Sequence, residues 1–326
     1  MKNLFSGEHF YDEAKSAKNR FPAIVTLLIF FILFWVSQSA MSVPIMLVEL
    51  PMAMEHFSAL GESPTFETLM SFFTSPPAEY AETVTIVQLF ATIIPAAIAI
   101  IFCRFAEGRS LRSMGFVKEK ALPKYLLGLA AGMVMFSAVL LLAVVTGNAS
   151  FGGIGVISSP LMYALICVGW LLQGAEEEII CRGWLMTSLS IKLPMWAAVI
   201  INSAFFSVMH LFNAGFNFLA ALNILLVGIM LSLFAVRFNN IWISCAIHSV
   251  WNWVQGNFYG LPVSGMATGS SVFNFELTGS ELWTGGSFGL ESGLGATIVC
   301  AVVILLLIFV PQKKKGVGNP TSAQAA

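Results

Sequence analysis

The chain alternates between long apolar runs and short polar segments. Eight of the runs have about 20 residues, the length a helix needs to cross a hydrocarbon core of about 30 Å. In lipid the backbone must satisfy its own hydrogen bonds, so such runs form helices. The pattern therefore predicts an all-α, polytopic transmembrane helical bundle of about eight helices, at roughly 22–48, 83–105, 124–146, 158–190, 194–212, 216–236, 240–258 and 292–311.

Proline, glycine and asparagine mark where these helices bend or end. Pro44 favours a kink or an early end in the first helix. Residues 194–236 are too long for one crossing, and the stretch Asn213 to Asn217 predicts a turn between two helices. Residues 49–82, with four prolines, and the Gly- and Ser-rich residues 259–290 are expected to be outside loops. Residues 106–123 are basic and mildly amphipathic, which fits either a segment on the inner membrane surface or an ordinary cytoplasmic loop.

The distribution of positive charge gives the orientation. Segments that alternate helices place on one side hold nearly all the lysines and arginines, and the segments on the other side hold none, as the positive-inside rule requires of cytoplasmic loops. The inside residues are Lys2, Lys15, Lys18, Arg20, Arg104, Arg109, Arg112, Lys118, Lys120, Lys124, Lys192, Arg237, Lys313, Lys314 and Lys315. We therefore expect a multi-pass cell-membrane protein with both termini cytoplasmic. Its organisation is a cytoplasmic segment at 1–21, a transmembrane domain at 22–311 and a basic, disordered tail at 312–326.

Composition agrees with this assignment. Hydrophobic residues make up 57% of the chain and charged residues 10%, whereas soluble domains carry about 25% charged residues. The net charge of −1 gives no indication of a nucleic-acid partner.

Ionisable residues inside membrane helices are costly and are candidates for function. They gather in three predicted helices: Gln173, Glu176, Glu177, Glu178 and Arg182 in the fourth, Asn202 and His210 in the fifth, and His248 and Asn252 in the seventh. Residues four apart share a helix face, so Glu178 can pair with Arg182 while Glu177 points elsewhere. Counting about 1.5 Å per residue from the cytoplasmic helix ends lets Glu177, His210 and His248 converge inside the bilayer, somewhat toward the cytoplasm.

A carboxylate facing two imidazoles has two chemical uses. Glu177 can take a proton from a water that attacks a carbonyl carbon, while His248 and Asn252 donate hydrogen bonds to the oxyanion. Alternatively, Glu177, His210 and His248 can hold a zinc ion with an open position for water. Either arrangement hydrolyses an amide. The competing interpretation is structural: a buried Glu–Arg pair or a membrane histidine can simply hold helices together.

Three motifs at these positions resemble the CPBP family, which comprises type II, glutamate-dependent CAAX prenyl proteases and related bacteriocin-processing and Abi proteins. They are EExxxR at Glu177–Arg182, FxxxH at Phe206–His210 and HxxxN at His248–Asn252. Each motif is weak alone, but their order, spacing and placement on separate helices match the family pattern. The resemblance covers roughly residues 100–258.

The resemblance implies a glutamate-activated or metal-dependent intramembrane endopeptidase. Glu177 would be the base acting on water, helped by His210, and His248 and Asn252 would form the oxyanion site. Glu178, Arg182 and Phe206 would be supporting residues. The third glutamate, Glu176, permits a shifted register, although the fixed distance to Arg182 favours Glu177 as the first motif glutamate.

The chain lacks the residues that define other classes of membrane protease. The chain has no HExxH or GxSxG motif, and its only aspartate is Asp12. The leading hypothesis is therefore an intramembrane endopeptidase that cuts a membrane-associated peptide or protein near the cytoplasmic side. The alternative is a non-enzymatic membrane protein, either a transporter or a bacteriocin-immunity scaffold, because transporters also bury charged residues at mid-membrane.

Overall fold

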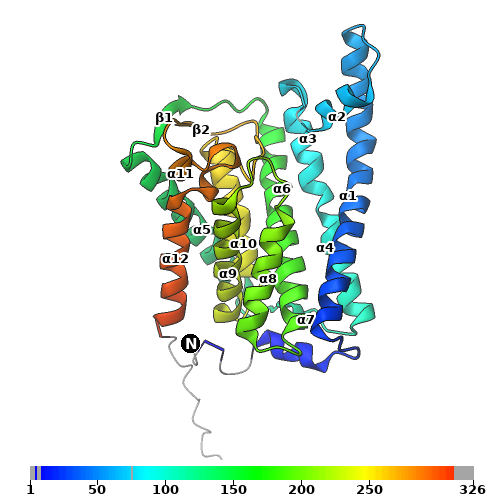
Figure 1. The fold of residues 1–326 in the computed structure, drawn as a ribbon, viewed down its shortest axis with the longest axis vertical. Coiled ribbons are helices and arrows are strands. Elements are labelled where there is room, and N and C mark those ends of the chain that lie inside the picture. Colours follow the sequence, from blue (N-terminus) through cyan, green and yellow to red (C-terminus); the bar gives the residue numbers. More distant parts are fainter. Residues whose placement is uncertain (1–3, 6–8, 75, 312–326) are drawn as a thin grey trace, which may run out of the picture.

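The computed structural model describes residues 4–5, 9–74 and 76–311 and is a bundle of long, nearly parallel or antiparallel helices (Figure 1). The predicted tail at 312–326 lies outside the described residues. The α-helices are α1 (Ala23–Ala59), α2 (Phe66–Thr74), α3 (Ala78–Ala91), α4 (Ile93–Ile101), α5 (Ala121–Val145), α6 (Pro160–Glu178), α7 (Thr187–Leu189), α8 (Met195–Met209), α9 (Phe218–Phe238), α10 (Trp242–Trp253), α11 (Glu281–Thr284) and α12 (Leu294–Phe309). The π-helical segments Phe102–Ala106, Ile179–Met186 and Val254–Phe258 extend α4, α6 and α10.

All eight predicted helical segments are present. Within the described residues, four helices are long and apolar enough to cross a membrane: Ala23–Ala59, Ala78–Ala106, Ala121–Val145 and Phe218–Phe238. Met195–Met209 and Leu294–Phe309 are shorter apolar helices. The chain is thus a multi-pass helical membrane protein. The start of α1 and the end of α12 lie at the same end of the bundle (Figure 1).

The first outside loop is shorter than the sequence predicts. Helix α1 continues for 37 residues and includes both Pro44 and Pro51. It therefore does not end near residue 48, and the segment 49–82 also contains α2 and the start of α3. Prolines are tolerated within membrane helices when neighbouring groups satisfy the freed backbone atoms.

The second outside loop contains structure that its composition does not reveal. Strand β2 (Phe273–Leu277) pairs antiparallel with β1 (Ala149–Ile154), with a register shift between Phe151 and Gly153. The helix α11 follows in the same loop. This strand pair lies at the end of the bundle opposite to the start of α1 (Figure 1).

The basic segment 106–123 is mostly irregular up to the start of α5. Its one regular element up to Lys120 is a three-residue turn, Arg112–Met114. Arg109 is fully buried, donates to Glu107 over 2.6 Å and also bonds Thr187 and Ser188. This buried ion pair fastens the segment to the end of the bundle.

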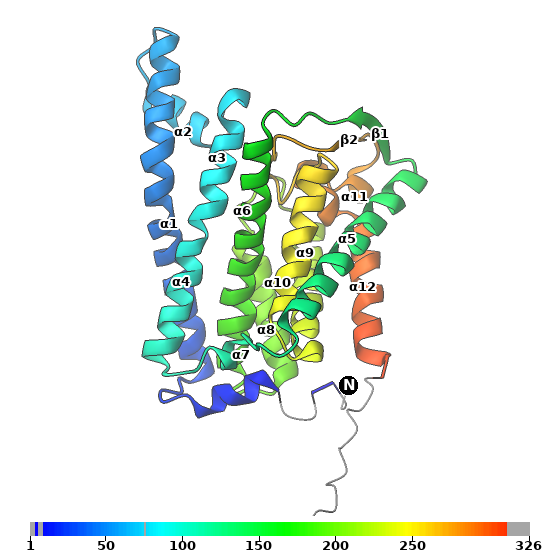
Figure 2. The same cartoon turned by 180° about the vertical axis from the view of Figure 1, so that it is seen from behind.

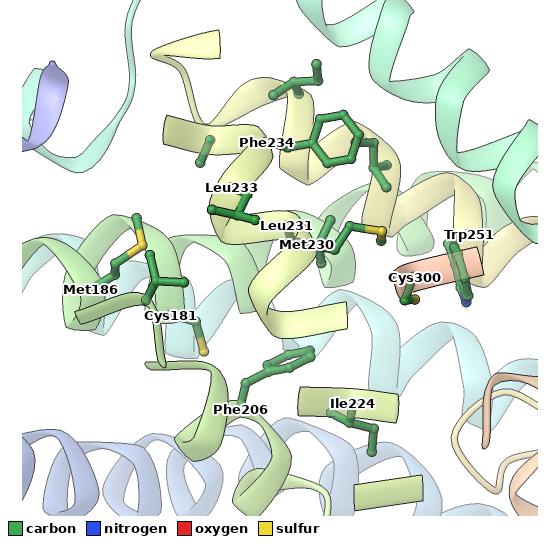
Figure 3. Packing of buried hydrophobic residues seen from close by; sticks show 14 of the residues in the cluster. Cys181, Met186, Phe206, Ile224, Met230, Leu231, Leu233, Phe234, Trp251 and Cys300 are labelled. Carbon is green, nitrogen blue, oxygen red and sulfur yellow. The ribbon is translucent and has the colours of Figure 1, made fainter. Parts of the chain in front are cut away.

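Glycines let the central helices approach closely. A Cβ on Gly132 of α5 would lie 2.7 Å from the carbonyl oxygen of Ile247 in α10, and one on Gly174 of α6 would lie 2.5 Å from the backbone nitrogen of Ser249. Helix α10 is therefore held between α5 and α6, while α1, α3 and α4 form a layer on one side (Figure 2). Figure 3 shows Phe206, Met230 and Leu231 in the apolar interior that α8 and α9 share.

Candidate active site

The first motif lies where α6 changes from an α-helix to a π-helix. Glu177 and Glu178 are the last two residues of α6, and Arg182 lies in the π-helical segment that follows. Such π-helical insertions change the direction of side chains and are frequent at functional sites. The expected turn after the second motif is also present, because α8 ends at Met209 and α9 begins at Phe218.

Glu178 and Arg182 form a fully buried ion pair. Arg182 Nη1 donates to Glu178 Oε1 over 2.8 Å, as the four-residue spacing predicts. Its Nη2 donates to the carbonyl oxygen of Gly228 in α9, and its guanidinium carbon lies 4.5 Å from the centre of the Phe206 ring. Arg182 therefore ties α6, α8 and α9 together behind the site.

His248 lies between the two motif glutamates. Its Nδ1 is 3.0 Å from Glu178 Oε1, and its Nε2 is 3.5 Å from Glu177 Oε2. Because Glu178 already accepts from Arg182 as a carboxylate, Nδ1 carries a proton and donates to it. Nε2 is thus the ring atom turned toward Glu177.

His210 caps the C-terminal end of α8. Its Nδ1 is 2.9 Å from the carbonyl oxygen of Phe206, and that oxygen can only accept, so Nδ1 carries the proton. The neutral ring therefore presents the lone pair of Nε2. The Phe206 ring lies edge-on to both histidines, with ring centres 5.0 Å from His210 and 5.9 Å from His248.

Gln173 connects Asn252 to Glu177. Asn252 Nδ2 donates to Gln173 Oε1 over 2.9 Å, and Gln173 Nε2 donates to Glu177 Oε1 over 2.6 Å. Glu177 Oε2 is buried and has no hydrogen-bond partner among the residues that the structure describes. One oxygen of Glu177 is therefore oriented by Gln173, and the other is available to accept a proton.

The candidate residues meet at one cavity of about 120 Å³, which is large enough for water. Its lining residues are Trp170, Gln173, Glu177, Phe206, His210, Asn213, Ile224, Val227, Met230, Leu231, Ile247, His248, Trp251, Asn252, Val263, Ser264, Met266 and Glu291. Glu178 and Arg182 do not line the cavity. They contact the lining residues His248 and Phe206 from the protein interior. Sequence reasoning placed the site toward the cytoplasm, whereas the wall includes Val263, Ser264 and Met266 from the predicted outside loop. The reason is that His210 ends its helix and the loop folds back over it.

Glu291 is a lining residue that sequence reasoning missed. It precedes α12 in a three-residue helical turn, Leu290–Ser292. Burial raises the pKa of Glu291, while hydrogen bonds from Ser264 and the charges of His210 and His248 act in the opposite direction. The predicted loop 259–290 carried no motif, so no sequence signal pointed to this carboxylate.

The register of the first motif follows from these contacts. Glu176 is buried but does not line the cavity, whereas Glu177 does. Because Glu178 holds Arg182, Glu177 is the first glutamate of the motif, as its distance from Arg182 predicts.

The donor set was tested for a zinc site. Nδ1 of His210 is engaged by Phe206 and Nδ1 of His248 by Glu178, so each histidine offers Nε2, the single nitrogen that a ligating histidine uses. Within the described part of the chain, no group of three or more His, Cys, Asp or Glu side chains has an arrangement that could hold a metal ion. We therefore derive no step of the reaction through a metal.

The comparison with protein families agrees with the site geometry. The family model described as "Type II CAAX prenyl endopeptidase Rce1-like" matches residues 158–254. This segment contains all three motifs, and the match confirms the resemblance to CAAX-type proteases of the CPBP family. A search of curated proteins finds no match. The match thus covers α6, α8, α9 and α10, the part of the chain that carries the candidate residues.

Proposed function

We propose that the protein is an intramembrane endopeptidase that hydrolyses a peptide bond of a membrane-associated peptide or protein. One observation carries the proposal: Glu177, His210, His248 and Asn252, from α6, α8 and α10, line one cavity. The match to a CAAX endopeptidase family supports it at the level of reaction class.

The reaction begins with a water molecule between Glu177 and the substrate. Glu177 Oε2 accepts a proton from the water, whose oxygen attacks the carbonyl carbon of the scissile bond. The resulting oxyanion accepts hydrogen bonds from Asn252 Nδ2 and from His248 Nε2 when that nitrogen is protonated. Since His248 Nδ1 already donates to Glu178, His248 acts here as a cation held between two carboxylates.

Collapse of the tetrahedral intermediate breaks the C–N bond. The proton that Glu177 took from water passes to the departing nitrogen, which leaves as an amine, and the other product is a carboxylic acid. His210, with its Nε2 lone pair in the neutral form, assists this proton transfer. Gln173 keeps Glu177 and Asn252 in register throughout.

Replacement of Glu177 tests the proposal. Purified protein in liposomes is incubated with a library of apolar peptides, and products are identified by mass spectrometry. Glu177→Gln keeps the shape but removes the base, so cleavage should fall by about 10²–10⁴-fold. Glu176→Gln is the matched control, because Glu176 does not line the cavity. Wild-type cleavage by Glu177→Gln would contradict the mechanism.

The non-enzymatic alternative is distinguished by Glu177→Asp. A proton-coupled transporter should keep transport with a changed pH dependence, because aspartate still binds a proton. A peptidase should lose most activity, because the shorter side chain misplaces the water. A scaffold should tolerate Glu177→Ala with no change in function.

A further inference from the structure

Three basic side chains lie where α1 begins and the extension of α4 ends. Lys18 and Arg20 precede α1, and Arg104 lies in the π-helical segment Phe102–Ala106. All three side chains are exposed. The start of α1 and the end of α4 lie side by side at one end of the bundle (Figure 1, Figure 2). We call the surface formed by these three residues the basic corner.

Hydrogen bonds fasten the two parts of the basic corner together. The backbone N–H groups of Lys18 and Asn19 both donate to the carbonyl oxygen of Glu107, over 3.0 and 3.3 Å. Asn19 Nδ2 donates to the carbonyl oxygen of Ala106 over 2.7 Å. A Cβ on Gly108 would lie 2.9 Å from Cδ of Lys18, so the stem of this lysine lies against the same backbone. The fold therefore builds the corner from two segments that are far apart in the sequence.

The basic corner has no carboxylate of its own. Residues 17–24 and 101–106, which form it, contain neither aspartate nor glutamate. The next carboxylates along the chain are engaged elsewhere: Asp12 with Lys15, Glu13 with Arg112, and Glu107 with Arg109. The corner therefore presents positive charge that these groups do not neutralise, and it is complementary to an anion.

Apolar side chains continue from the basic corner along the outside of the bundle. Ile24 of α1, Ile101 of α4 and Phe105 are 64%, 55% and 83% exposed. The distribution of lysine and arginine predicts that this end of the bundle lies at the cytoplasmic membrane surface, where basic side chains meet anionic lipid headgroups. Positive charge beside exposed apolar side chains matches a molecule that has an anionic head and acyl chains.

We propose that the basic corner is a binding site for an anionic phospholipid, whose phosphate contacts Lys18, Arg20 and Arg104 and whose acyl chains lie along the exposed apolar side chains beside them. This inference does not depend on the proposed function, because it concerns a surface outside the cavity.

The basic corner is connected to the helix that carries the first motif. The ring of Phe102 lies 5.1 Å from that of Trp184, in the π-helical segment that follows Glu178. A lipid bound across the start of α1 and the end of α4 therefore stabilises the packing of α4 against this segment. We expect the bound lipid to raise the thermal midpoint of the protein, since a ligand that binds the folded state stabilises it.

Native mass spectrometry of the purified full-length protein tests the inference. The protein is sprayed from detergent micelles that contain equal amounts of phosphatidylglycerol and phosphatidylcholine with the same acyl chains, and the retained lipids are counted. The wild type should retain phosphatidylglycerol about fivefold more often or better. Added phosphatidylglycerol should also raise its thermal midpoint more than phosphatidylcholine does.

Substitutions of exposed residues locate the site. Lys18→Gln, Arg20→Gln and Arg104→Gln should each lower the preference for phosphatidylglycerol about threefold to fivefold, because each removes one charge near the headgroup. Lys18→Arg should retain the preference. Lys118→Gln is the matched control, since Lys118 is an exposed lysine of another predicted inside segment, and it should behave as the wild type.

Equal retention of the two lipids by the wild type would overturn the inference. An equal loss of preference in Lys118→Gln would also overturn it, because binding would then reflect the overall charge of this end of the bundle. Glycerol 3-phosphate carries the phosphate without acyl chains and should not displace phosphatidylglycerol at the same concentration. Displacement would assign the basic corner to a soluble phosphate compound and contradict a lipid site.

Discussion

Gln173 Nε2 donates to Glu177 Oε1 over 2.6 Å, and the same amide accepts from Asn252 Nδ2 over 2.9 Å. One amide side chain thus sets the distance between the proposed base, on α6, and the proposed oxyanion donor, on α10. A leucine in place of Gln173 has a similar size but makes no hydrogen bond, so neither Glu177 nor Asn252 would be oriented by it.

We therefore predict that Gln173→Leu lowers kcat by about tenfold to a hundredfold, because a misplaced base activates the attacking water less efficiently. The effect on KM should be smaller. Steady-state cleavage of a dye-labelled peptide measures both constants. Gln88→Leu is the control, since Gln88 donates to Glu49 far along the chain from the cavity residues. An unchanged kcat in Gln173→Leu would show that Glu177 needs no orientation by this amide.

The buried Glu178–Arg182 pair gives a prediction about stability. Removing one partner leaves the other charge buried, which costs about 3–5 kcal/mol. Arg182→Met should therefore lower the thermal midpoint in detergent markedly, and Glu178→Gln in the same protein should restore part of it. A double variant that is no more stable than Arg182→Met alone would contradict this account.

The sequence predicted most of the fold because lipid imposes strong rules on it. All eight apolar runs became helices, and the turn between α8 and α9 falls where Asn213 to Asn217 placed it. The end of α1 was wrong because proline, which ends helices in water, is tolerated in a membrane helix. The β1–β2 pair was missed because Ala149–Ile154 and Phe273–Leu277 pair across a long separation that no local pattern records.

Part of the site was also predictable, because its residues lie at regular positions on membrane helices. Helix periodicity placed Glu178 on the same helix face as Arg182 and turned Glu177 away from that face. The observed contacts confirm both placements. Gln173 lies four residues before Glu177, so the same periodicity could have found it. Glu291 reaches the cavity only through the fold of the outer loop, and nothing in its neighbourhood, Gly289 to Gly293, distinguishes it from a surface glutamate.

The close approach of α6 and α10 leads to a third prediction. A Cβ on Gly174 would lie 2.5 Å from the backbone nitrogen of Ser249, next to His248. Gly174→Val should push the helices apart, lengthen the 3.5 Å separation of Glu177 and His248, and abolish most activity. Ala164→Val, on an exposed part of α6, is the control and should cleave normally. Activity and thermal midpoint are measured on both, and a fully active Gly174→Val would show that this spacing is not critical.

Removal of metal is the fourth test, and it separates the two chemical uses of Glu177. Within the described residues, no group of three or more His, Cys, Asp or Glu side chains is arranged so that it could hold a metal ion. We therefore expect cleavage to survive dialysis against a strong chelator with less than about a twofold loss, whereas a zinc hydrolase loses its activated water with its metal. The measurement is the cleavage rate before and after chelation, with metal content determined by mass spectrometry. Full loss of cleavage that returns with added zinc, and not with magnesium, would establish instead that Glu177, His210 and His248 move together to bind a metal.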